Sequence, residues 1–86
     1  MFRVELATSP RRFYAGAERP LASKLARCFS QLETDPRRHN NIKPLKGAFV
    51  GLHRFRVGDW RVVYRIDDAR GVVYVLDIAH RCDIYE

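Results

Sequence analysis

The chain has 86 residues, a mass of 10.1 kDa and a formal net charge of +6, and it is 47% apolar and 30% charged. This length predicts a single domain, residues 1–86, with one core and no deep cavity for a large cofactor. The composition excludes a disordered chain, and no apolar run approaches the roughly 18 residues that a membrane span needs. The two cysteines, Cys28 and Cys82, are too few for a disulfide scaffold, so we expect a reduced, cytoplasmic protein.

The first half of the chain predicts a strand followed by two helices. Apolar and charged residues alternate over residues 2–7, which is typical of a strand with one buried face. Ser9 and Pro10 indicate the start of a helix, and Pro20 opens a second one whose apolar residues recur every three or four positions. Asp35 ends that helix, because a residue followed by proline avoids the helical region. The two helices are therefore expected to form a hairpin.

The second half of the chain predicts a basic loop followed by three strands. Residues 37–47 are polar and contain proline and glycine, so we expect a loop there. Alternating patterns then predict strands over 52–57, 60–66 and 72–79. The element order is β-α-α-β-β-β. This order predicts an α+β fold in which an antiparallel sheet carries the N-terminal helical hairpin on one face and leaves the other face open.

A two-residue turn at Gly58 and Asp59 sets the expected pairing of the first two of these strands. Glycine in first place suits a type II′ turn, which matches the twist of a hairpin, and it puts Arg56 directly opposite Arg61. A directly opposed pair of like charges costs about 0.2–1 kcal/mol, so the pair is unfavourable unless an anion or an acid lies between the two. On this register, the face opposite the helices carries four arginines: Arg54, Arg56, Arg61 and Arg65.

The last strand has two possible registers. A five-residue loop over 67–71 buries four residues of that strand: Val72, Tyr74, Leu76 and Ile78. It leaves Asp77 on the open face opposite Arg61, with Arg81 beyond it on the same face. A four-residue loop would bury Asp77 instead. Because burying a lone carboxylate is costly, we expect the five-residue loop.

Charge and chemistry point to an anionic partner. Between Asp35 and Asp59 the chain has six basic residues and no acid, which suits nucleic acid or an acidic protein. Four of the six lie in the expected loop and are candidates for binding RNA: Arg37, Arg38, Lys43 and Lys46. Arginine can hold a phosphodiester but cannot act as a general base, so His80 and Tyr85 are the candidates for proton transfer. No metal site is expected from His80, Cys82 and Asp83, because adjacent residues of a strand point apart.

Several segments resemble the RelE/ParE superfamily of bacterial and archaeal type II toxins, and the resemblance covers essentially the whole chain. They are Ser9-Pro10, residues 43–47 (KPLKG), residues 51–64 (GLHRFRVGDWRVVY) and the ending 78–85 (IAHRCDIY), which favours the RelE side. The resemblance implies a toxin that is neutralised by an antitoxin encoded beside it, and the net charge of +6 predicts that this antitoxin is acidic. It also implies cleavage of mRNA in the ribosomal A site, without a metal or other cofactor. The ribose 2′-hydroxyl would attack the adjacent phosphodiester and leave a 2′,3′-cyclic phosphate.

The resemblance further implies which residues form the site. The matching positions are Arg54, Arg56, Arg61, Arg81 and Tyr85. The best-known RelE pattern has lysines at the positions of Arg54 and Arg56, one of them in the role of the base. In this chain His80 or Tyr85, the substrate or ribosomal RNA would have to assist proton transfer.

Two other functions remain open at this stage. A ParE-like inhibitor of DNA gyrase would need no nuclease residues, and the ending from His80 to Tyr85 argues against it. An inactive relative would only bind its antitoxin. For the favoured function we expect an antitoxin, the ribosome and mRNA as partners, no membrane, and no sequence-specific DNA binding by the toxin alone.

Overall fold

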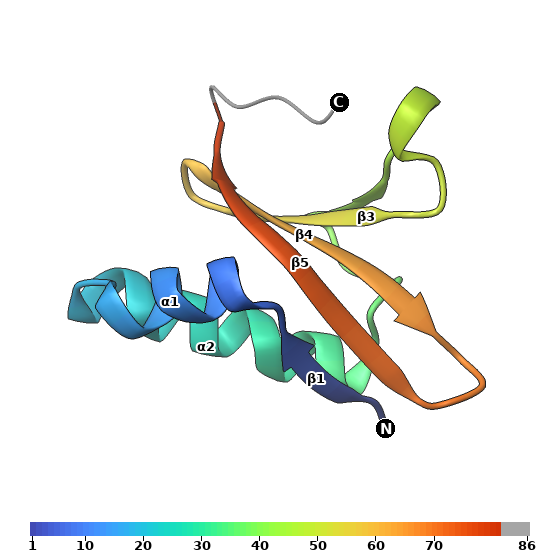
Figure 1. Ribbon diagram of the computed structural model, residues 1–86, viewed down its shortest axis with the longest axis horizontal. Coiled ribbons are helices and arrows are strands. Elements are labelled where there is room, and N and C mark those ends of the chain that lie inside the picture. The colour runs from blue at the N-terminus through green and yellow to red at the C-terminus, as the bar shows by residue number, and fades with distance from the viewer. Residues whose placement is uncertain (82–86) are drawn as a thin grey trace.

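Two helices lie side by side against one face of a five-stranded sheet in the computed structural model, which describes residues 1–81 (Figure 1). The helices are α1 (Thr8–Gly16) and α2 (Arg19–Thr34), and a short 3-10 helix covers Gly47–Phe49. The strands are β1 (Arg3–Leu6), β2 (Ile42–Pro44), β3 (His53–Val57), β4 (Trp60–Asp67) and β5 (Val72–His80). Their order in the sheet is β1-β5-β4-β3-β2. The predicted α+β class is therefore confirmed.

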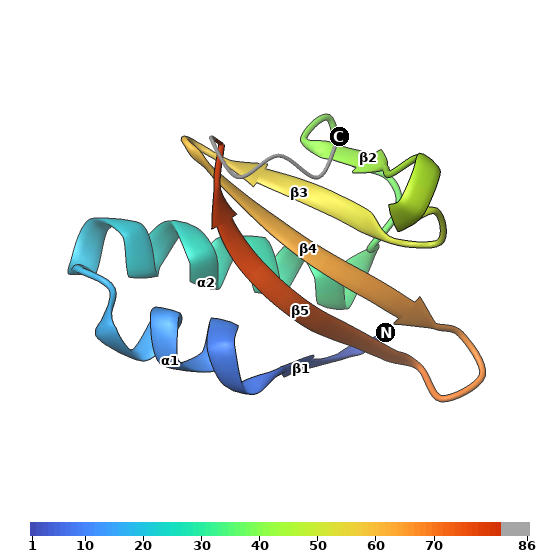
Figure 2. The same ribbon diagram turned by 45° about the horizontal axis from the view of Figure 1, so that its top comes forward.

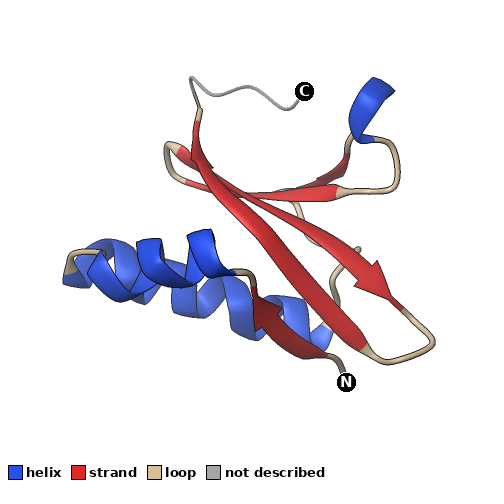
Figure 3. Cartoon of the chain, in the orientation of Figure 1, coloured by secondary structure: helices blue, strands red, loops and turns tan. Residues whose placement is uncertain are grey.

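The apolar stripe of α2 supplies the helical side of the core. Leu25, Cys28 and Leu32 recur at helical spacing and are buried against the sheet, where residues of β3, β4 and β5 meet them. Both helices lie on this one side, as Figures 2 and 3 show. Burial raises the pKa of the Cys28 thiol to about 12, so this cysteine is unreactive near neutral pH. Within residues 1–81, neither helix is long and apolar enough to cross a membrane.

The first strand departs from the predicted antiparallel sheet. Strands β2 to β5 pair antiparallel, but β1 pairs with β5 in parallel, with Arg3 opposite Val72, so the sheet is mixed. The reason lies in the position of α1, the next element of the chain. Phe13 of α1 packs on Trp60 with ring centroids 4.7 Å apart, close to the carboxyl end of β5. Strand β1 has to run in the direction of β5 to bring the chain to that place.

The expected loop over 37–47 contains a short strand. Ile42 is buried and pairs with Phe55, and Lys43 pairs with Arg54, so β2 forms the edge of the sheet beside β3. The loop prediction is wrong for these three residues. Proline and lysine are typical of edge strands. They interrupt the alternation of apolar and polar residues that predicts a strand, so the sequence did not reveal β2, which is held in place by its pairing with β3.

A β-bulge decides the register of β5. The loop between β4 and β5 has four residues, since Asp67 pairs with Val72, and not the five that we expected. The bulge beside Val63 and Tyr64 leaves Leu76 without a partner and restores the alternation beyond it, so Asp77 stays on the open face, opposite Val63 instead of Arg61. The predicted inward positions of Tyr74 and Leu76 are wrong, and two other valines of β5 take their places in the core: Val73 and Val75.

The buried phenol of Tyr64 connects the sheet to the turn after α2. Its hydroxyl donates a hydrogen bond of 2.6 Å to the carbonyl of Pro36, and burial raises the pKa of the phenol, which keeps it a donor. We predict that Tyr64→Phe lowers the free energy of unfolding by about 1–2 kcal/mol, because it leaves a buried carbonyl without its donor. Urea unfolding measures the loss. Tyr74→Phe, on the opposite face of the sheet, is the matched control, and an equal loss in both variants would contradict the assigned role.

Candidate functional site

The turn between β3 and β4 brings two arginines together at one end of the sheet. Gly58, the first residue of the turn, has a φ of 60°. Within residues 1–81 only glycines have a positive φ, so Asp59, the second residue, has a negative one, and this combination defines a type II′ turn. Arg56 lies directly opposite Arg61, as the sequence predicted. The side chain of Arg56 is exposed and that of Arg61 is half-buried.

A third arginine is fastened to the same turn from the end of β5. The backbone N–H of Arg81 donates to the carbonyl of Asp59 over 2.7 Å, and its guanidinium lies 3.8 Å from the Asp59 carboxylate. Both side chains are largely exposed, so this ion pair orients Arg81 without burying its charge. We refer to Arg56, Arg61 and Arg81 as the arginine cluster. It unites two residues that flank one turn with a third that lies 20 positions further along the chain.

Arg54 has a different environment from the arginine cluster. It lies on the predicted face but is only 5% exposed, and its Nη1 donates to the carbonyl of Asn41 over 2.7 Å. The same carbonyl accepts the backbone N–H of Arg56 over 2.9 Å. Arg54 therefore holds the segment before β2 against β3, next to the strand position of Arg56.

His80 lies on the face of the sheet that the helices cover. It pairs with Trp60, and the two rings meet edge to face with centroids 5.1 Å apart. Neighbouring strand residues alternate between faces, so the structure places His80 on the side opposite Arg61 and not beside it. Tyr85, the other candidate for proton transfer, lies outside the described residues.

The four basic residues of the predicted RNA-binding loop differ in their surroundings. Arg37 makes a two-point ion pair with Asp68, with distances of 3.0 and 2.8 Å, in the loop between β4 and β5 at the far end of the sheet from the arginine cluster. This pair lowers the pKa of the Asp68 carboxyl. Arg38, Lys43 and Lys46 are exposed, and Lys43 lies beside Arg54 across the β2–β3 pairing. The structure therefore leaves three of the four available to a partner.

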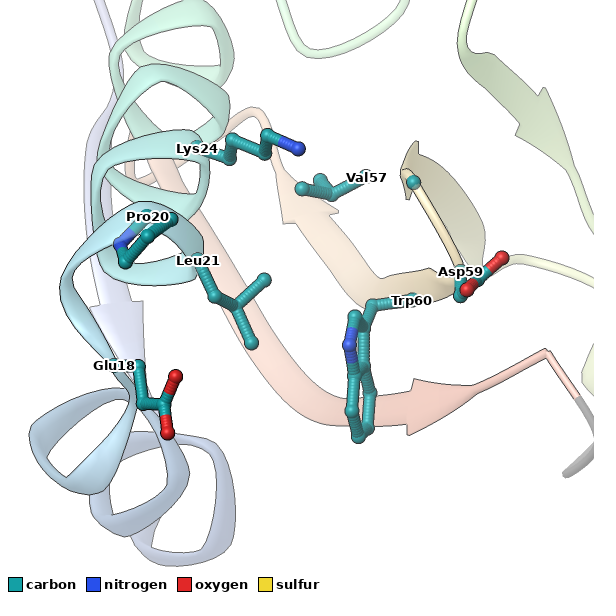
Figure 4. Close-up of a pocket in the computed structure, with 8 residues that line it drawn as sticks. Glu18, Pro20, Leu21, Lys24, Val57, Asp59 and Trp60 are labelled. Carbon is teal, nitrogen blue, oxygen red and sulfur yellow. The ribbon is translucent and has the colours of Figure 1, made fainter.

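A cleft of about 440 Å³ opens on the helix side of the same hairpin. Leu21 of α2 and Trp60 of β4 lie on its two sides, and Glu18, Lys24 and Asp59 line it as well (Figure 4). Acidic and basic groups mix here, and none of the arginine cluster is among the described residues that line it. We therefore assign the candidate site to the arginine cluster and not to this cleft.

Two residues that position the cluster were not singled out from the sequence. Asn41 acts through its backbone carbonyl, which any residue could supply, so its side chain gave no signal. Asp59 was part of the predicted turn, but its place beside Arg81 depends on the register of β5, which the sequence did not reveal.

Comparison with protein families identifies the class of this protein. Residues 6–85 match the family described as the ParE toxin of the type II toxin-antitoxin system parDE. The chain belongs to this family and is thus a toxin of a type II toxin–antitoxin system. The resemblance of the sequence to the RelE/ParE superfamily is confirmed.

Individual relatives lie on the RelE side of the superfamily. Toxin RelG of Mycobacterium tuberculosis is 35% identical over 85 residues, which cover 98% of this chain and 95% of the relative. Toxin RelE of the same organism is 38% identical over 79 residues, covering 92% and 79% of the two chains. The toxin–antitoxin complex RelBE2 of M. tuberculosis superimposes with a TM-score of 0.78 at 27% identity, covering 93% of this chain and 98% of the other. The archaeal RelE–RelB complex of Pyrococcus horikoshii shares the fold, with a TM-score of 0.77 at 22% identity and coverage of 93% and 94%.

A histidine at the far end of the sheet makes stability depend on pH. His53 stacks on Tyr64 with ring centroids 5.7 Å apart, and its buried Nδ1 has no hydrogen-bond partner within residues 1–81. Burial, and then the nearby charge of Arg37, lower the pKa of this imidazole. The folded state therefore favours neutral His53 more strongly than the unfolded state does.

We predict that the free energy of unfolding falls as the pH is lowered from about 7.5 to about 5.5, because the unfolded chain takes up a proton that the folded chain resists. His53→Gln removes this dependence over the same range. Urea unfolding at several pH values measures it, and the carboxyls with lowered pKa, Asp35 and Asp68, act only at more acidic pH. A native protein whose stability is the same at both pH values would refute the assignment.

Proposed function

We propose that this toxin is a RelE-type endoribonuclease that cleaves mRNA on the translating ribosome in the cytoplasm. The supporting observation is the directly opposed pair of Arg56 and Arg61, which Arg81 joins at the same end of the sheet. Guanidinium groups gathered at one end of a sheet can hold a phosphodiester through charge-assisted hydrogen bonds to its oxygens. The curated relatives named RelG and RelE support the RelE direction over gyrase inhibition.

In the proposed reaction the 2′-oxygen of a ribose attacks the adjacent phosphorus, and the bond from phosphorus to the 5′-oxygen of the next nucleotide breaks. The products are a 2′,3′-cyclic phosphate and a free 5′-hydroxyl. The arginine cluster would hold the non-bridging oxygens and stabilise the negative charge that builds up on them in the transition state. Arg54, which is buried beside Arg56, would add a fixed positive charge without touching the RNA.

Two proton transfers remain to be supplied in this mechanism. The 2′-hydroxyl has to lose a proton and the leaving 5′-oxygen has to gain one, and guanidinium groups do not release protons near neutral pH. His80 packs on Trp60 on the opposite face of the sheet, so we do not assign it this role. We assign the acid step to Tyr85, and the base step to the RNA substrate or to the ribosomal RNA around it.

The partners follow from charge. A basic toxin with a net charge of +6 should bind an acidic antitoxin segment that folds on its surface, in line with the neighbouring structures described as toxin–antitoxin complexes. On the ribosome, we propose that exposed Arg38, Lys43 and Lys46 contact ribosomal RNA. Arg37 contributes less, because Asp68 already neutralises it.

We predict that Arg61→Ala and Arg81→Ala each slow mRNA cleavage by about 10²-fold or more, because each removes a contact to the charge of the transition state. Cleavage is measured by mapping mRNA 5′ ends after induction in cells. Arg65→Ala is the matched control, since Arg65 lies on the same strand and face as Arg61 but lies over the ring of Tyr74 instead.

Full cleavage by both variants would remove the arginine cluster from the mechanism. A gyrase supercoiling assay on the same protein separates the classes of function. Inhibited supercoiling together with intact mRNA would reject the nuclease and favour the ParE-like alternative.

We also predict that Tyr85→Phe slows cleavage by roughly 10²-fold, the lower range of a general acid–base contribution. The variant keeps the ring and loses only the hydroxyl, so RNA binding should stay within twofold of the parent protein. Single-turnover cleavage on programmed ribosomes measures the rate. An unchanged rate would exclude Tyr85 as the acid.

A further inference from the structure

A basic groove lies at the edge of the sheet, close to the arginine cluster. It has a volume of about 310 Å³ and opens between α2 and the end of β3 that β2 leaves uncovered. Residues of α2, of β3 and of the segment before β2 line it. Those that carry polar or charged groups are Lys24, Arg27, His39, Asn41 and Arg56.

Three cations of this groove are not neutralised by the described chain. Lys24 and Arg27 lie three positions apart on α2, next to the buried Cys28, so both side chains flank the side of the helix that faces β3. Arg56 approaches from β3. All three are exposed, none forms an ion pair with a carboxylate of residues 1–81, and the described lining includes no Asp or Glu. Such a group of charges favours an anionic ligand.

A fixed aromatic ring lies in the same groove. His39 packs on Phe55, with ring centroids 4.8 Å apart and planes inclined by 29°, and His39 remains exposed overall. Its Nδ1 accepts the backbone N–H of Asn41 over 3.0 Å, which holds the ring in this orientation. A flat ring held beside several cations is the combination by which proteins bind single-stranded nucleic acid, through stacked bases and neutralised phosphates.

We propose that this groove binds single-stranded RNA, with Lys24 and Arg27 on the phosphates and a base stacked on His39. The proposal rests on the proposed nuclease function and extends it. Arg56 lines the groove and also lies opposite Arg61. An RNA molecule bound in the groove would therefore continue to the arginine cluster. An acidic peptide would use the cations but not the ring, and for this reason the observations favour RNA.

The first test measures binding without cleavage. A fluorescent 2′-O-methyl oligouridine has no free 2′-hydroxyl and stays intact, so its anisotropy reports affinity for the full chain. We expect the double variant Lys24→Gln, Arg27→Gln to bind it about tenfold more weakly at about 0.1 M salt. We also expect the slope of log affinity against log salt to become shallower by about 1.4, from two lost contacts at about 0.7 each.

The matched control is the double variant Arg11→Gln, Arg12→Gln. It removes the same charge from the exposed surface of α1, which does not line the groove. Its affinity should stay within about twofold of the parent protein, since steering by net charge alone is screened by salt. Equal losses in the two double variants would overturn the proposal, because they would reduce the effect to net charge.

The second test isolates the stacked base. His39→Ala should weaken binding of the base-bearing oligonucleotide about fivefold or more and leave binding of an abasic one of equal length unchanged. Equal losses on both ligands would overturn the assignment of His39. A groove variant that loses affinity for a polyglutamate peptide but not for RNA would overturn the proposal and identify the groove as a protein-docking surface.

These results are separable from those on the nuclease. Groove-dependent RNA binding by a protein that leaves mRNA intact would reject the proposed nuclease and support the groove. Normal cleavage together with RNA binding that does not depend on Lys24 and Arg27 would support the nuclease and reject the groove.

Discussion

The two-residue turn at Gly58 and Asp59 is the constraint on which the arrangement of the sheet depends. A strand shifted by one residue moves every side chain to the other face. With the turn in place, Phe55 and Val62 enter the core beneath the helices while Arg56 and Arg61 meet on the other side. The same turn supplies the carbonyl and the carboxylate of Asp59 that hold Arg81. The packing of the core and the position of the arginine cluster therefore both depend on the conformation of this turn.

Features governed by local chemistry were predictable from the sequence. The turn required only a glycine in first position, the end of α2 required only the Asp35–Pro36 step, and the α+β class followed from the two periodicities. The bulge at Leu76 was not predictable in this way. It resolves a conflict between a four-residue loop and a carboxylate that must stay out of the core, and only the assembled sheet contains both. The parallel pairing of β1 likewise depends on where α1 finds its packing partner.

The candidate site shows the same division. The opposition of Arg56 and Arg61 was predictable because it depends on the turn alone. The burial of Arg54 was not, since it is decided by the path of the segment that precedes β2. The ion pair of Arg37 with Asp68 joins residues 31 positions apart. No local sequence pattern at either position predicts that the two residues meet. His80 was placed beyond the last strand, whereas β5 includes it and thereby fixes its face against Trp60.

The pairing of β1 with β5 has a consequence for how the protein is made. Residues 3–6 and 72–75 form neighbouring strands, so β1 finds its partner in the sheet only when β5 has emerged from the ribosome (Figure 1). Contacts between such distant segments form late and slowly, because the intervening chain must first be ordered. Without β5, strand β1 lacks its partner in the sheet and α1 lacks the strand with which it makes most of its contacts. Folding of the toxin during its own translation is thereby delayed until the residues of β5 have left the ribosome.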